Sequence, residues 1–130
     1  MSVSFEDFLK SAEELLNNSD SKEIDFRNLI SRSYYAMFHL SKEVAQQLNT
    51  TIRYEQDKEL GSHNEIFIQY KRSSDKNLQQ LAKLMYASKT NRVTADYHIN
   101  QSIERSDAAH HFYAIKAIIK KLQQAKERLE

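Results

Sequence analysis

The chain contains no proline and only one glycine in 130 residues. Proline and glycine interrupt helices more strongly than other residues, so their near absence leaves long helices free to form. Apolar residues also recur at three- and four-residue spacing along most of the sequence. Because a chain of this length supports one hydrophobic core, we expect a single all-α domain over residues 1–130. Its expected architecture is an antiparallel bundle of about five helices, two of them long.

The periodicity places two helices in the first part of the chain. Ser4 and Asp7 have the spacing of a capping box, which predicts that the first helix begins after Ser4 and ends near residue 17. The second helix is expected over about residues 24–48. At 1.5 Å per residue it would be roughly 37 Å long.

The remaining helices are expected to be two short ones and one long one. A third begins near Ser62 and a fourth follows the polar residues 73–76. Long connections are expected over residues 49–62 and 90–101. Residues 108–129 carry a narrow apolar seam, so we expect this last helix to pack antiparallel to the second.

Composition limits the kinds of partner and the chemistry. Nineteen basic and eighteen acidic side chains give a formal net charge of +1, so any nucleic-acid site must be local. The chain has no cysteine, which excludes disulfides and cysteine-based metal sites. No apolar run is long enough to span a membrane, and the first residues do not resemble a signal peptide. We therefore expect a cytoplasmic protein with no membrane partner, no metal and no cofactor.

The second helix carries polar residues on the side opposite its apolar stripe. Asn28, Arg32, Tyr35 and His39 share this side, which is expected to face solvent. Arg32 and His39 differ by about 20° around the axis and by roughly 10.5 Å along it. An aromatic ring between an arginine and a histidine suits a partner surface or a base-stacking site, although a solvated face with one tyrosine has the same pattern.

Three segments together resemble a known family. Residues 31–39 read S-R-S-Y-Y-A-M-F-H, which resembles the second-helix signature of HEPN domains. Ser62-His63 at the start of the third helix, and Arg92 followed by Ala95-Asp96-Tyr97, are similar to further family motifs in the same order.

The resemblance implies a function and a set of site residues. HEPN proteins are typically homodimers in which an arginine and a histidine from both subunits form one metal-independent ribonuclease cleft. Arg32 and His39 match that pair and are the expected catalytic residues, with Asn28, Tyr35 and Ala36 in the RNA-binding or dimer interface. A neutral histidine takes the proton of a ribose 2′-hydroxyl and arginine stabilises the phosphate charge, which leaves a 2′,3′-cyclic phosphate. Such an enzyme would act as a toxin or defence effector.

A second interpretation stays open because the motif departs from the commoner family pattern. Six residues separate Arg32 from His39, Ser33 follows the arginine, and Ser41 occupies a position where one toxin–antitoxin subgroup has a tyrosine. The alternative is a non-catalytic HEPN module that binds a nucleotide or a partner protein, such as a minimal nucleotidyltransferase acting as its antitoxin.

The other polar candidates are interpreted as structural. Asp96 is expected to cap backbone amides and Tyr97 to pack against the bundle, both from the connection before the last helix. His110 and His111 are adjacent on a helix, so their side chains diverge by about 100° and cannot share a metal ion. His63 is expected to be structural or solvent-facing.

Overall fold

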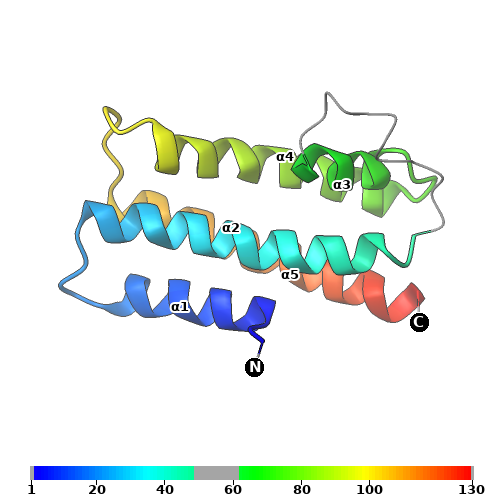
Figure 1. Cartoon of the computed structure of the whole chain (residues 1–130), viewed down its shortest axis with the longest axis horizontal. Coiled ribbons are helices and arrows are strands. Elements are labelled where there is room, and N and C mark those ends of the chain that lie inside the picture. Colours follow the sequence, from blue (N-terminus) through cyan, green and yellow to red (C-terminus); the bar gives the residue numbers. More distant parts are fainter. Residues whose placement is uncertain (1, 49–61, 130) are drawn as a thin grey trace.

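The computed structural model describes residues 2–48 and 62–129, and these residues form helices without any strand. The five helices are α1 (Phe5–Asn17), α2 (Glu23–Ala45), α3 (Ser62–Lys71), α4 (Lys76–Tyr97) and α5 (Arg105–Leu129) (Figure 1). This confirms the all-α class and the five helices. The connection expected over residues 49–62 lies, apart from Ser62, outside the described residues. None of the described helices is long and apolar enough to cross a membrane.

Aspartate side chains stabilise the starts of four helices. A carboxylate accepts a hydrogen bond from a backbone N–H that the helix leaves without a partner, and its charge also suits the positive end of the helix dipole. The capping box predicted at the first helix is confirmed. The pairs are Asp7 with Ser4 N (2.8 Å), Asp25 with Lys22 N (2.8 Å), Asp75 with Asn77 N (2.8 Å) and Asp107 with Glu104 N (2.9 Å).

The helix α2 lies at the centre of the bundle. In Figure 1 it lies between α1 and the α3–α4 pair, and α5 passes behind it. Two clusters of buried hydrophobic residues include residues of α2. The larger joins its second half to α3, α4 and α5, and the smaller joins its first half to α1 and the start of α5. Because α2 is packed on several sides, only a narrow strip of it remains accessible.

The last helix runs parallel to α2, so the expected antiparallel packing is wrong. Glu23, the first residue of α2, accepts a hydrogen bond from the N–H of Ile103, just before α5. Glu43 near the end of α2 forms an ion pair of 3.3 Å with Lys126 near the end of α5. The direction follows from the topology, because α3 stays at one end of the bundle and only α4 runs back along it (Figure 1).

The fourth helix is longer than the sequence predicted. It continues to Tyr97, so the bundle has three long helices, and the connection expected over residues 90–101 is wrong for residues 90–97. Burial of side chains stabilises the additional helical turns, since Arg92 is 9% exposed and Ala95 only 2%. These contacts lie far apart in sequence, which explains why local periodicity did not reveal them.

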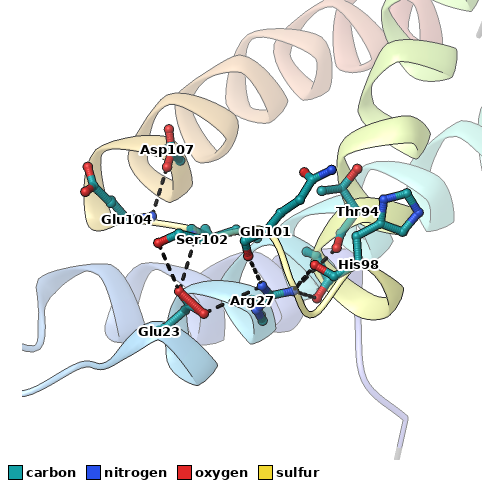
Figure 2. Close-up of polar contacts among 10 residues, drawn as sticks. Glu23, Arg27, Thr94, His98, Gln101, Ser102, Glu104 and Asp107 are labelled. Atoms are coloured by element: carbon teal, nitrogen blue, oxygen red, sulfur yellow. Dashed lines mark hydrogen bonds and ion pairs between the residues drawn. The ribbon is translucent and has the colours of Figure 1, made fainter.

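A buried arginine of α2 holds the end of α4. The Arg27 guanidinium donates hydrogen bonds to the carbonyls of Thr94, Ala95, His98 and Gln101, the contact with Ala95 being 2.9 Å (Figure 2). The carbonyls of Thr94 and His98 also accept backbone hydrogen bonds, so Arg27 is a second donor to them, whereas for Ala95 and Gln101 it is the donor found among the described residues.

Candidate functional site

The accessible strip of α2 carries the residues that the sequence placed on its non-core side. Asn28 and His39 are exposed and Arg32 and Tyr35 are half-buried, and we call these four residues the α2 stripe. The expectation for Ala36 is wrong, because this residue has no exposed surface and belongs to the larger core cluster. One step along a helix rotates the side chain by about 100°, which turns Ala36 away from the face of Tyr35. Ala36 therefore contacts neither RNA nor a partner subunit.

Arg32 lies where α2 meets α1. Its Nη1 donates a hydrogen bond of 2.8 Å to Ser11 Oγ on α1. No carboxylate in the described residues forms an ion pair with Arg32. Arg32 therefore has no direct ion-pair partner among the described residues, although Asp7 lines the same surface pocket.

His39 lies further along the same stripe. Its ring is 5.1 Å from the Phe8 ring on α1 and 6.3 Å from the Tyr35 ring. Partial burial, and then the positive charge of Lys42, lower the pKa of His39 below its usual 6.5. The imidazole is therefore mainly neutral at pH 7, the form that accepts a proton.

A second histidine, to which the sequence assigned no function, also lies near Tyr35. Nδ1 of His63 on α3 is 2.5 Å from the hydroxyl of Tyr34, and its ring stacks on Phe38 at 4.0 Å. Its ring centroid is 5.9 Å from that of Tyr35. Burial, followed by the charges of Arg92, Lys89 and His39, lowers the pKa of His63 to about 4. Tyr35 is thus near two neutral imidazoles.

Arg92 of α4 supports this aromatic group from within the bundle. Its guanidinium carbon is 5.3 Å from the Tyr34 ring centroid and 5.7 Å from that of Tyr35, within range of a cation–π interaction. Its Nη1 forms an ion pair of 3.3 Å with Asp96, and its buried Nε has no hydrogen-bond partner in the part of the chain that the structure describes. Arg92 therefore connects α4 to the α2 stripe.

Asp96 and Tyr97 differ from their expected roles. Both lie on the last turn of α4 rather than in a connection. The side chain of Asp96 pairs with Arg92 one turn earlier instead of capping backbone amides. Tyr97 is 69% exposed, so it does not pack against the bundle.

The two serines that depart from the commoner HEPN pattern are buried. Ser33 Oγ donates to the carbonyl of Leu29 and Ser41 Oγ to that of Phe38, both at 2.7 Å. Neither side chain has exposed surface. The hydroxyls of Ser33 and Ser41 are therefore satisfied by the backbone of α2 itself, and both residues lie outside the α2 stripe.

The adjacent histidines of α5 have different surroundings. His111 is 4% exposed and hydrogen-bonds the backbone of Ile30, whereas His110 is exposed. Within the described ranges, no three histidine, aspartate or glutamate side chains are grouped so that they could hold a metal ion. These residues do not add to the site on α2.

Comparisons with known proteins add no assignment. Protein-family models, curated proteins and solved structures were searched, and none of them matches the chain. The functional interpretation therefore rests on the chemistry of the α2 stripe, which combines an arginine without an ion-pair partner, an exposed neutral histidine and an aromatic ring.

Proposed function

We propose that the chain is a metal-independent endoribonuclease of the HEPN type, in which His39 and Arg32 act on the RNA backbone. The observation that carries the proposal is that His39 is exposed and mainly neutral on the same strip of α2 as Arg32, which forms no ion pair within the described residues. Tyr35 lies between them and offers a ring on which an RNA base can stack. A toxin or defence effector is the role that this activity suits.

The reaction uses the neutral form of His39. The imidazole accepts the proton of a ribose 2′-hydroxyl, and the resulting oxygen attacks the adjacent phosphorus. The bond between phosphorus and the 5′-oxygen breaks, and this oxygen takes a proton from solvent. The products are a 2′,3′-cyclic phosphate and a 5′-hydroxyl. Arg32 stabilises the negative charge that develops on the phosphate oxygens.

A homodimer brings the two residues together. Within one chain they are roughly 10.5 Å apart along α2, which is too far for both to contact one phosphate closely. A two-fold axis perpendicular to α2 at the position of Tyr35 lies midway between them. It would place Arg32 of one subunit opposite His39 of the other, and the cleft would then contain residues of both chains.

The test is cleavage of a mixed RNA pool in EDTA, with the product ends mapped. The proteins are the wild type, Arg32→Ala, His39→Ala and the control His110→Ala, which removes an exposed histidine on α5. The wild type and the control are expected to cleave and to leave cyclic phosphates. Each site variant should lose at least 100-fold in rate, the usual contribution of general acid–base or electrostatic catalysis.

A second candidate function is a non-catalytic module that binds a nucleotide or a partner such as a minimal nucleotidyltransferase. It is favoured by the hydrogen bond between Arg32 and Ser11, which holds the guanidinium against α1. If a well-folded wild-type protein does not cleave RNA, this function replaces the first. A stable complex that Arg32→Ala weakens and His110→Ala does not would support it.

A further inference from the structure

The hydrogen bond between Tyr34 and His63 determines which nitrogen of the imidazole carries the proton. Tyr34 is completely buried, and His63 Nδ1 is the one partner found for its hydroxyl among the described residues. Burial also raises the pKa of Tyr34 well above its ordinary value, so the hydroxyl keeps its proton. If Nδ1 were the donor, this buried hydroxyl proton would have no acceptor, which is costly. Tyr34 therefore donates to Nδ1, and the neutral imidazole carries its proton on Nε2.

The aromatic neighbours hold the His63 ring in one orientation. It is nearly parallel to the rings of Phe38 and Tyr34, with interplanar angles of 14° and 3°, and it meets Tyr35 edge-on at 81°. His63 is half-buried, and its Nε2 is not among the buried atoms without a partner. No hydrogen bond to Nε2 is found within residues 2–48 and 62–129. Within these ranges Nε2–H is thus a donor of fixed direction near Tyr35, without an acceptor from the described residues.

The surroundings of this donor favour an anion. The charged or titratable groups that lower the pKa of His63 are Arg92, Lys89 and His39, all of them basic, and Lys42 acts on His39 in the same direction. The ion pair with Asp96 offsets the charge of Arg92. Lys89 and Lys42, which form no ion pair among the described residues, are then the cations left near the two histidines. A positive group of this kind beside stacked aromatic rings suits the backbone and bases of a single RNA strand.

We propose that His63, oriented by Tyr34, donates a hydrogen bond from Nε2–H to a phosphate oxygen of the RNA strand that lies on the α2 stripe. The inference rests on the proposed RNA site and adds a substrate contact outside the Arg32 and His39 pair. It also gives Tyr34 a defined part as a positioning residue, because its hydroxyl selects the tautomer that donates. The ring of Tyr35 is then close to both histidines, 5.9 Å from His63 and 6.3 Å from His39 between centroids.

The first measurement records the imidazole nitrogen and proton signals of the wild-type protein by NMR. The probe is a 2′-O-methyl hexanucleotide, which cannot be cleaved because its 2′-oxygens are blocked. In the free protein, His63 is expected to show an unprotonated Nδ1 and a protonated Nε2. Addition of the probe should shift the Nε2 signal of His63 and leave the signals of His110 unchanged. Inorganic phosphate at the same concentration should produce no comparable shift.

The second measurement compares affinities for the same probe. His63→Ala is expected to weaken binding roughly tenfold, as for one hydrogen bond to a charged group, and His110→Ala to leave it unchanged. Tyr34→Phe retains the ring but removes the hydroxyl that selects the tautomer. It should weaken binding less than His63→Ala, and the His63 signals of this variant should show a mixture of tautomers.

The outcomes separate this contact from the cleavage activity. If the wild type cleaves RNA but the His63 signals do not respond to the saturating probe, the contact is wrong and the ribonuclease remains. If His63 responds and no RNA is cleaved, the contact remains and the catalytic proposal is wrong. An equal response to inorganic phosphate would overturn the RNA strand as the ligand, and absence of both probe binding and RNA cleavage would overturn both proposals.

Discussion

His111 is a buried histidine whose protonation opposes folding. Desolvation lowers its pKa to about 4, although its hydrogen bond to the backbone of Ile30 acts in the opposite direction. Unfolding returns the imidazole to its usual pKa of about 6.5. Between these two values the unfolded chain binds a proton that the folded chain does not, so stability falls as the pH is lowered through this range.

Replacing His111 should therefore make folding less sensitive to acid. The lowered pKa of His111 accounts for a loss of roughly 3 kcal/mol in the free energy of unfolding when the pH falls from 7 to 4. Urea unfolding at several pH values in this range should show a smaller loss for His111→Leu than for the wild type. His110→Ala, which removes the exposed neighbour, should retain the wild-type loss. Parallel pH profiles for the wild type and His111→Leu would contradict this account.

Residues that share one helix could be assigned from the sequence, and residues brought together by the tertiary fold could not. Arg32, Tyr35 and His39 were found because helical spacing alone places them on one side of α2. The pair of Tyr34 and His63 was missed, since 29 positions separate them and the contact depends on how α3 packs against α2. The signal that the sequence did carry was the resemblance of Ser62-His63 to a family motif at the start of the third helix.

Among the helices, the end of α4 is the part that depends most on a single side chain. Arg27 is 7% exposed and donates to four carbonyls at and beyond the end of α4. Arg27→Ala removes the donor of all four contacts and is expected to cost about 3 kcal/mol of stability. Arg27→Lys should recover only part of the loss, because one ammonium group cannot reach as many carbonyls as a guanidinium.

Amide hydrogen exchange shows whether Arg27→Ala destabilises the end of α4 or the whole bundle. Arg27→Ala should increase exchange first in the last turns of α4, around Thr94 and Ala95, whose carbonyls Arg27 binds. Arg128→Ala is the matched control, since Arg128 is an exposed arginine that forms one ion pair of 3.8 Å with Asp75. That variant should change stability by less than about 0.5 kcal/mol. Similar losses in the two variants would show that the carbonyl contacts of Arg27 contribute little.

The helices also show which features of the fold the apolar spacing of the sequence does not predict. Apolar spacing located all five helices, because burial of one face imposes that spacing on any packed helix. It did not give the direction of α5, since an apolar seam has the same spacing in parallel and antiparallel packing. It also did not extend α4 through residues 90–97, where Arg92 and Ala95 are buried by contacts with distant parts of the chain.

At the scale of the whole molecule, the proposed dimer predicts how mixtures of two inactive variants behave. If Arg32 comes from one chain and His39 from the other, the cleft of a dimer contains two Arg32–His39 pairs, related by the two-fold axis. A heterodimer of Arg32→Ala and His39→Ala then retains one pair with both residues intact. Each homodimer of either variant has none.

Mixing the two inactive variants should therefore restore cleavage. With random exchange of subunits at equal concentrations, half of the dimers are heterodimers, so activity should reach about a quarter of the wild-type value per subunit. The mixture is incubated until exchange is complete, as followed by native mass spectrometry, and is then assayed on the RNA pool. The control mixes two preparations of His39→Ala that carry different tags, and this mixture should remain inactive. If heterodimers form and activity does not return, the two residues act within one chain and the two-fold arrangement at Tyr35 is wrong.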